Sequence, residues 1–138
     1  MNKVLVKRLI EMAKRAQKNS YSPYSRYPVG ASVVGASGKI YTGANIENAS
    51  FGLSICAERV AIFKAISNGE KSIKNVCVVA KLATPCGACR QVIAEFADKD
   101  ASVICVDYHP LEKNKEKITI IPVRKLLYRP FEPNKAGL

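Results

Sequence analysis

Two short stretches organise the sequence: Cys56-Ala57-Glu58 and, thirty residues further on, Pro85-Cys86-Gly87-Ala88-Cys89. Together they supply three thiols and one carboxyl group. Three thiolates can hold a zinc ion and leave its fourth tetrahedral position open, which a catalytic site needs and a structural site lacks. The carboxylate of Glu58 would then be free to move protons beside the metal. We therefore expect a fold in which the three cysteines meet around Zn²⁺.

Both stretches are expected to open helices. Ser54 is a suitable N-cap for a helix over residues 54–67. Thr84 can cap a second helix, which has Pro85 at its first position and ends near residue 98. The positive end of each helix dipole favours thiolates. Because zinc with three thiolates carries a formal charge of −1, two helix N-termini would offset that charge.

The rest of the chain alternates strands with helices, which predicts a three-layer α/β/α domain with a mixed five-stranded sheet. No linker divides the sequence, so residues 1–138 are expected to form a single catalytic domain. The expected elements besides the two helices above are a helix over 3–18, strands over 29–34, 40–44, 74–81, 101–106 and 118–121, and a short helix over 123–127.

Composition narrows the class of protein. Apolar residues make up 48% and charged residues 24%, which is typical of a soluble globular chain, and no apolar run is long enough to span a membrane. The start, Met1–Val4 followed by charged residues, does not read as a signal peptide, so we expect a cytoplasmic protein. The net charge of +11 could attract nucleic acid, but only residues 113–117 are densely basic. Dispersed, solvated lysines are the preferred interpretation.

Two other interpretations of the cysteines stay open. The first is a structural zinc site with Cys77, Cys105 or His109 as fourth ligand. The two cysteines lie in apolar strand runs and are expected in the core, and His109 lies in a polar turn. The second is a thioredoxin-like redox pair at residues 86–89, which needs no metal but leaves residues 56–58 without a role.

Arg59 directly follows the candidate proton carrier. Its guanidinium could donate hydrogen bonds to the thiolate sulfurs and withdraw negative charge from the metal. The alternative is a solvated position on the helix surface. We favour the role beside the sulfurs.

Five stretches in the same order and spacing resemble the small homotetrameric zinc-dependent cytidine deaminases over nearly the whole chain. They are Tyr21-Ser22-Pro23-Tyr24-Ser25, Val29-Gly30-Ala31, Asn45-Ile46-Glu47-Asn48-Ala49, Cys56-Ala57-Glu58-Arg59 and Pro85-Cys86-Gly87-Ala88-Cys89-Arg90-Gln91. A lone P-C-x-x-C would be weak, but the set is specific.

The resemblance implies a hydrolase of pyrimidine salvage that converts cytidine and 2′-deoxycytidine to uridine and 2′-deoxyuridine with release of ammonia. Cys56, Cys86 and Cys89 would hold the zinc that activates water, and Glu58 would be the proton shuttle. The implied substrate is a small nucleoside, and nucleic acid is an unlikely partner.

The resemblance also implies substrate contacts. Asn45 and Glu47 would bind the ribose hydroxyls, Tyr27 would pack near the pyrimidine, and Ala57 would offer backbone contacts to the base. The alternative for Asn45 and Glu47 is turn chemistry without a ligand. Tyr27 could equally be a core aromatic residue.

A final set would act between subunits of a homotetramer. Phe131 resembles the aromatic residue near the family's C-terminus that closes the pocket, commonly from another subunit. Ala49, Ser50 and Phe51 would reach a neighbour's site. Phe131 could instead be a core aromatic residue.

Three alternatives to a deaminase of cytidine and 2′-deoxycytidine remain. A deaminase of polynucleotide cytosine would use the basic surface, but no basic stripe interleaved with aromatic residues is visible. A deaminase of a cytosine nucleoside antibiotic of the blasticidin S type would share the zinc motif, but is not expected to keep Asn45-x-Glu47. A zinc-stabilised binding module would have no need of Glu58.

Overall fold

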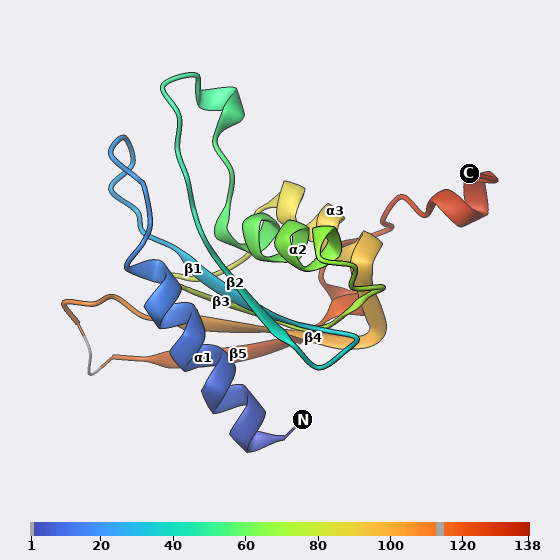
Figure 1. Cartoon of the computed structure of the whole chain (residues 1–138), viewed down its shortest axis with the longest axis horizontal. Coiled ribbons are helices and arrows are strands. Elements are labelled where there is room, and N and C mark those ends of the chain that lie inside the picture. The colour runs from blue at the N-terminus through green and yellow to red at the C-terminus, as the bar shows by residue number, and fades with distance from the viewer. Residues whose placement is uncertain (1, 113–114) are drawn as a thin grey trace.

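The computed structural model describes residues 2–112 and 115–138. Figure 1 shows one sheet with helices on both faces. The helices and strands are α1 (Lys3–Gln17), β1 (Gly30–Gly35), β2 (Ile40–Ala44), η1 (Phe51–Leu53), α2 (Ala57–Ser67), β3 (Ile73–Ala80), α3 (Gly87–Phe96), β4 (Ala97–Asp107), β5 (Lys117–Pro122), η2 (Val123–Lys125) and η3 (Pro133–Ala136). The expected α/β class and three-layer arrangement are confirmed.

The sheet has the strand order β2-β1-β3-β4-β5. β1 is antiparallel to both β2 and β3, β3 is parallel to β4, and β4 is antiparallel to β5. The expected mixed five-stranded sheet is thus confirmed, with β3 in the centre and β5 at an edge. Because β2 and β3 run in the same direction, their carboxyl ends lie at one edge of the sheet. The chain enters α2 after β2 and α3 after β3, so both helices can begin there.

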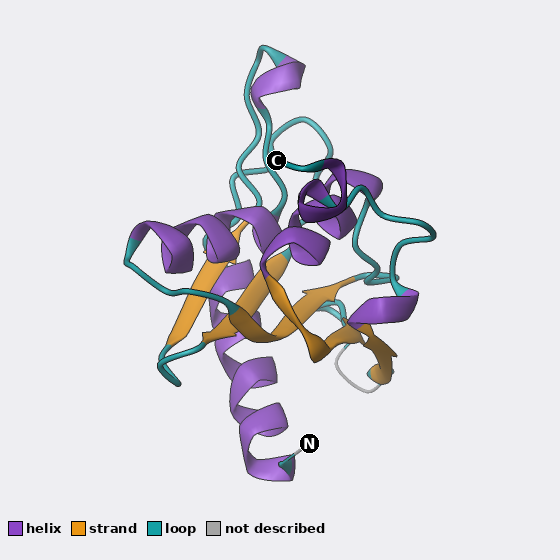
Figure 2. Cartoon of the chain, turned by 90° about the vertical axis from the view of Figure 1, so that its right-hand side faces the viewer, coloured by secondary structure: helices purple, strands orange, loops and turns teal. Residues whose placement is uncertain are grey.

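The two faces of the sheet have separate hydrophobic cores, and Figure 2 shows α1 on the side opposite α2 and α3. α1 is amphipathic, and its N-cap Asn2 accepts a hydrogen bond from the Val4 amide at 2.8 Å. Its apolar stripe packs on Val34, Cys77, Val79, Ile104 and Val106. On the other face, α2 and α3 cover Val33, Val76, Val78, Val103 and Cys105. Cys77 and Cys105 are therefore core residues, as expected.

The predicted N-caps of α2 and α3 were wrong. Cys56 is the N-cap of α2 and Cys86 that of α3, both with extended backbone. The predicted caps have other partners: the Ser54 hydroxyl accepts from the Asn48 amide at 3.0 Å, and the Thr84 hydroxyl accepts from Arg90 at 2.9 Å. Pro85 consequently precedes the second helix instead of beginning it.

Other boundaries differ by a few residues. α3 ends at Phe96 and not near residue 98, because β4 begins at Ala97, four residues before the predicted strand. The short helix predicted over 123–127 is the single 3₁₀ turn η2. Within the described ranges, none of the helices is long and apolar enough to cross a membrane. Residues 113–114 of the basic run lie outside the described residues.

Candidate active site

Three sulfur atoms meet where α2 and α3 begin. The Sγ atoms of Cys56, Cys86 and Cys89 all lie within 4.8 Å of one another, and those of Cys56 and Cys86 are 3.7 Å apart. A tetrahedral zinc ion with bonds of about 2.3 Å to sulfur requires neighbouring sulfurs about 3.8 Å apart. The three sulfurs are therefore a suitable donor set for zinc, and the spacing of the Cys56 and Cys86 sulfurs matches that of a tetrahedral site.

The metal-capable cluster in the described part of the chain contains these three cysteines alone. Cys77 and Cys105 lie in strand cores and His109 lies outside the cluster, so the structural-site interpretation lacks its fourth protein ligand. The redox-pair interpretation is also weakened, because Cys56 lies against Cys86 as a third sulfur.

The groups around the sulfurs favour one thiolate, that of Cys56. Hydrogen bonding with Cys89, aided by Arg59 and Cys86, lowers the pKa of the Cys56 thiol to about 5, and the same contact raises the pKa of Cys89. The first thiolate therefore opposes formation of the next, as expected for like charges in contact. A divalent cation would remove this opposition by pairing with all three sulfurs.

Arg59 lies against the cluster. Its Nη2 donates to the Cys56 sulfur at 3.4 Å. Its Nε is buried and, among the described residues, has no hydrogen-bond partner. Negative charge nearby stabilises a guanidinium group in this position through charge-assisted hydrogen bonds. Three thiolates would supply that charge.

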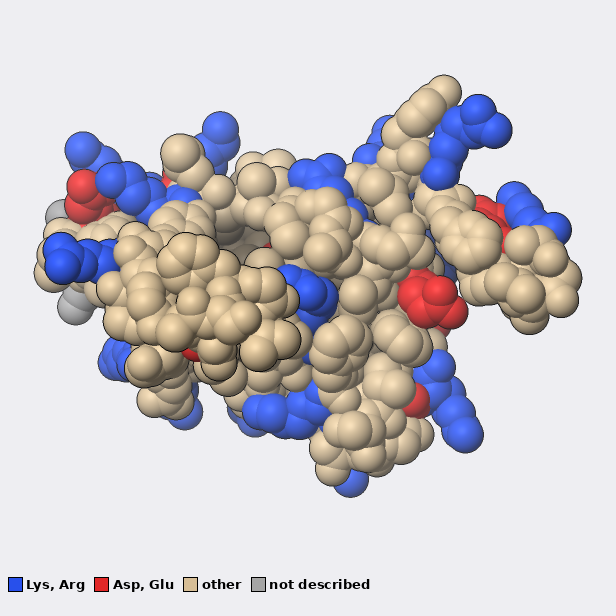
Figure 3. Space-filling view, turned by 90° about the horizontal axis from the view of Figure 1, so that it is seen from above, with Lys and Arg blue, Asp and Glu red and all other residues tan. Residues whose placement is uncertain are grey.

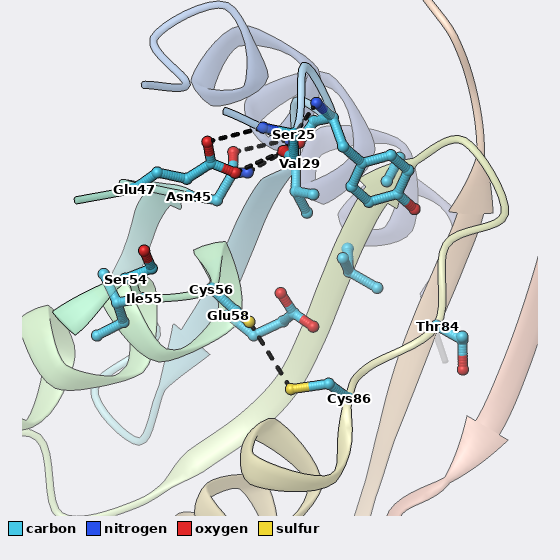
Figure 4. Close-up of a pocket in the computed structure, with 13 residues that line it drawn as sticks. Ser25, Val29, Asn45, Glu47, Ser54, Ile55, Cys56, Glu58, Thr84 and Cys86 are labelled. Carbon is cyan, nitrogen blue, oxygen red and sulfur yellow. Dashed lines mark hydrogen bonds between the residues drawn. The ribbon is translucent and has the colours of Figure 1, made fainter. Parts of the chain in front are cut away.

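Glu58 lies in the first turn of α2, and only 3% of it is exposed. Burial is the main cause that raises the pKa of its carboxyl group to about 7. In Figure 4 the carboxyl group lies beside the Cys56 and Cys86 side chains and faces the open space of the pocket. The geometry gives a carboxyl group that can accept and release a proton near neutral pH.

The pocket next to Glu58 has a volume of about 410 Å³. Its remaining lining residues are Ser25, Tyr27, Val29, Asn45, Glu47, Ser54, Ile55, Cys56, Val78, Ala80, Thr84 and Cys86. They combine apolar walls with a few polar groups, which is the usual make-up of a small-molecule site. Figure 3 shows a hollow in the upper face of the molecule, with lysines and arginines scattered over that face.

Asn45 and Glu47 lie together on the pocket wall, across from the sulfurs (Figure 4). The Asn45 side chain accepts from the Val29 amide at 2.9 Å and donates to the Tyr27 carbonyl at 2.8 Å. The Glu47 carboxylate accepts from the Tyr24 and Ser25 amides at 2.9 and 3.1 Å and from the Ser25 hydroxyl. These bonds hold the loop before β1 in place, and those from Ser25 and Tyr24 lower the pKa of Glu47.

The other predicted substrate residues divide between the pocket and its surroundings. Tyr27 lines the pocket, and Ala57 is fully buried at the start of α2 and does not line it. Residues 49–51 and Phe131 do not line the pocket of their own chain. Phe51 and Phe131 are 72% and 58% exposed, so the structure does not make either of them a core aromatic residue.

Seven lining residues were not predicted. Ser25 and Val29 lie within motifs quoted above, so the family resemblance could have identified both as pocket residues. The others, Ser54, Ile55, Val78, Ala80 and Thr84, reach the pocket only through the register of the sheet and the entry into the helices.

Comparison with known proteins agrees with this geometry. The family model for the cytidine and deoxycytidylate deaminase zinc-binding region matches residues 4–105. A cytidine deaminase from Sporosarcina psychrophila is 50% identical over 96 residues, covering 67% of this chain and 71% of its own. A probable cytidine deaminase from Dictyostelium discoideum is 46% identical over 110 residues, covering 77% and 74%.

A solved structure gives the same result. The crystal structure of cytidine deaminase from Burkholderia pseudomallei superposes with a TM-score of 0.82 at 35% identity, over 95% of this chain and 100% of that one. The shared fold, the zinc-binding region and the three-cysteine cluster agree, and this chain belongs to the zinc-dependent cytidine and deoxycytidylate deaminase family.

Proposed function

We propose that this chain is a zinc-dependent hydrolase that deaminates cytidine and 2′-deoxycytidine to the uridine nucleosides, releasing ammonia, in pyrimidine salvage. The observation that carries the proposal is the buried carboxyl group of Glu58, in a pocket of about 410 Å³, directly beside three clustered thiols. A structural metal site would have no need of an acid in that position. The cytidine deaminases that resemble this chain support the same choice of substrate.

Cys56, Cys86 and Cys89 would hold the zinc ion, with Arg59 donating to the Cys56 sulfur. When bound, zinc supplies a Lewis acid that lowers the pKa of water and makes it a nucleophile at neutral pH. Each hydrogen bond to a sulfur withdraws negative charge from the ligand set. Arg59 would therefore keep the trithiolate site electrophilic enough for this chemistry.

Glu58 would move the protons. Its carboxylate accepts a proton from the attacking water and donates it to N3 of cytosine as the new C4–O bond forms. It then takes the proton of the new hydroxyl and passes it to the amino group, and the C4–N bond breaks to release ammonia. A carboxyl group whose pKa is raised to about 7 by burial can perform both directions of transfer near neutral pH.

Asn45 and Glu47 would anchor the sugar. Both lie across the pocket from Glu58, so a nucleoside held by its hydroxyl groups there would direct its base toward the sulfurs (Figure 4). Tyr27 would pack near the pyrimidine, and the backbone of Ala57 would contact the base. Free cytosine, which lacks the sugar, would lose the bonds to Asn45 and Glu47.

The direct test incubates purified, zinc-loaded protein with cytidine, 2′-deoxycytidine, cytosine, cytidine monophosphate, blasticidin S and a cytosine-containing single-stranded oligonucleotide. We expect rapid deamination of the two nucleosides and very slow deamination of the rest. A preference for the oligonucleotide or for blasticidin S would overturn the proposed substrate class.

We further propose that the enzyme is a cytoplasmic homotetramer, with cytoplasmic location inferred from a site that needs reduced thiols. Phe51 at the tip of η1 and Phe131 on the C-terminal segment are exposed, and neither lines the pocket of its own chain. Exposed apolar side chains of this kind are often buried in symmetric contacts between the subunits of an oligomer. Phe131, with residues Ala49, Ser50 and Phe51, would complete the site of a neighbouring subunit.

Mixed assemblies test this arrangement. A Glu58→Ala chain lacks the proton shuttle but keeps Phe131, and a Phe131→Ala chain has the reverse defect. In co-refolded tetramers some sites would combine an intact Glu58 with a neighbour's Phe131, so activity should exceed the sum of the separate variants. Strictly additive activity in tetramers verified to be mixed would show that each chain builds its own pocket.

A further inference from the structure

The hydroxyl group of Tyr27 joins two segments that border the pocket. It donates a hydrogen bond to the Lys81 carbonyl, which is 54 positions away in the sequence. Tyr27 lines the pocket, so this bond ties one wall of the pocket to the segment that follows β3. Burial, followed by the negative charges of Glu58 and Asp107, raises the pKa of Tyr27, so the hydroxyl keeps the proton that it donates.

The Lys81 end of this bond is held firmly. The next residue, Leu82, donates its amide to the Asp107 carboxylate at 2.7 Å, and the Tyr108 amide donates to the Ala80 carbonyl at 2.8 Å. Leu82 has a φ of 55°, a conformation that a leucine adopts only when its surroundings require it. The Lys81 carbonyl is therefore a fixed acceptor.

Further along the same segment, Arg90 holds the approach to Cys86. Its Nη2 donates to the Thr84 hydroxyl at 2.9 Å and its Nε to the Pro85 carbonyl at 2.8 Å. These bonds do not involve Tyr27. Loss of the tyrosine hydroxyl would therefore leave the position of the Cys86 sulfur unchanged.

The Tyr27 end is held less firmly. Residues 23–27 are all exposed, and the loop is attached chiefly through the Glu47 carboxylate and the Asn45 side chain. The Tyr27 amide donates only to the nearby Ser25 hydroxyl, at 3.1 Å. Without its hydroxyl bond, no side-chain hydrogen bond among the described residues would hold the Tyr27 ring, and it could rotate away from the pocket.

We propose that the Tyr27 hydroxyl is a latch that fixes the aromatic wall of the pocket against the Lys81 carbonyl, making Tyr27 a positioning residue for a planar pyrimidine base. This inference rests on the proposed function, because the base is that of the proposed nucleoside substrate. A ring that is already fixed loses little further conformational entropy when the base binds against its face, whereas a mobile side chain would have to be ordered first. The aromatic wall contacts the base equally in the bound substrate and in the transition state. The latch therefore affects KM more than kcat.

The central variant is Tyr27→Phe, which removes only the hydroxyl group. The matched control is Tyr41→Phe, which removes a hydroxyl that donates to Glu70 at 2.8 Å on a residue that does not line the pocket. For Tyr27→Phe we expect KM for cytidine to rise about two- to tenfold, the range for one lost hydrogen bond, with kcat within about twofold. Tyr41→Phe should change neither constant, and both variants should retain zinc.

A second variant, Asp107→Ala, releases the acceptor side of the latch. It should raise KM as well, although Asp107 does not line the pocket. Because both variants disable the same bond, the double variant should raise KM by less than the product of the two single effects. A full product, or an unchanged KM in Tyr27→Phe, would overturn the latch.

Hydrogen exchange gives a readout that does not depend on activity. In Tyr27→Phe the amides of Tyr24 and Ser25, which now bond to Glu47, should exchange faster, and those of residues 86–90 should not change. Exchange that is unchanged in both segments would overturn the latch even in an active enzyme. A wild type that does not deaminate cytidine would refute the proposed function alone, while the exchange comparison would still decide whether the latch exists.

Discussion

Gly43 on β2 lies directly beneath α2, the helix that carries Glu58, and the Gly43→Ala change tests how closely they must pack. An added Cβ atom would lie 2.6 Å from the Ala61 nitrogen and 2.7 Å from the Ala57 oxygen. Both are backbone atoms, so no side-chain rotation can relieve the overlap. Ordinary contact begins at 3.4 Å, and β2 and α2 would therefore have to separate by about 0.8 Å.

The size of the effect follows from this overlap. Overpacking against a rigid neighbour lowers the free energy of unfolding by about 1–3 kcal/mol. Replacing glycine with alanine raises it by about 0.4–1 kcal/mol, because alanine restricts the unfolded chain. We expect a net loss of about 1–2 kcal/mol, or a fall in Tm of about 3–10 °C for a chain of this size. Because Ala57 lies between Cys56 and Glu58, and zinc sites tolerate only about 0.2 Å in ligand distance, zinc affinity and kcat should fall as well.

The assay compares Gly43→Ala with Gly35→Ala by calorimetry, zinc retention against a chelator, and cytidine turnover. The three atoms nearest to a Cβ atom at Gly35 all belong to the flexible Glu70 side chain, which otherwise accepts from the Ser37 amide at 2.9 Å and from the Tyr41 hydroxyl. Gly35→Ala should lower Tm and leave kcat and zinc retention intact. Equal losses of kcat in both variants, or normal zinc affinity in Gly43→Ala, would show that the metal site does not depend on the close packing of β2 against α2.

Three further outcomes are expected. Cys89→Ala should lose zinc, measured by atomic absorption, and unfold at a lower temperature, because metal binding is coupled to folding; full occupancy would remove it from the ligand set. Glu58→Gln should keep zinc while turnover falls by at least ~10²-fold, since an amide cannot accept the proton; near-normal turnover would exclude the shuttle role. Glu47→Ala should narrow the ratio of kcat/KM between cytidine and cytosine; an unchanged ratio would show that Glu47 does not bind the sugar.

The Cys86–Cys89 part of the metal cluster was predictable because the spacing of these two residues is local. Cys86 and Cys89 are three positions apart at the start of a helix, which places both side chains on one side of the first turn. That Cys56 joins them was expected from the chemistry of three thiols near two predicted helix starts, and the structure shows that both helices begin at the same edge of the sheet. The α/β class followed from the same alternation of strands and helices.

The helix caps could not be predicted from local propensity. Ser54 and Thr84 have the right chemistry for N-caps, but Asn48 and Arg90 use their hydroxyl groups. The residues that do cap the helices, Cys56 and Cys86, are poor capping residues, and neither makes a side-chain cap bond. A metal ion held by both sulfurs would account for their position, and no propensity scale includes that ion.

The walls of the pocket depend on long-range register. Val29 and Val78 reach the pocket because β1 and β3 pair with Gly30 opposite Val79. Ile55 reaches it because its backbone pairs with that of Ile46. A shift of one residue in either pairing would turn these side chains to the opposite face. No local pattern in the sequence fixes that register.

The two interpretations of Asn45 and Glu47, turn chemistry and sugar binding, prove compatible. Both side chains hold the loop that carries Tyr27, and both line the pocket. In the described structure the Asn45 amide nitrogen makes one bond of the two it can donate, and Glu47 Oε2 accepts from the Ser25 hydroxyl alone. Each side chain therefore keeps hydrogen-bonding capacity for a ligand after the loop is built. A substrate hydroxyl bound there would tighten the same network that positions the loop, so the proposed sugar binding and the placement of the aromatic wall would be energetically coupled.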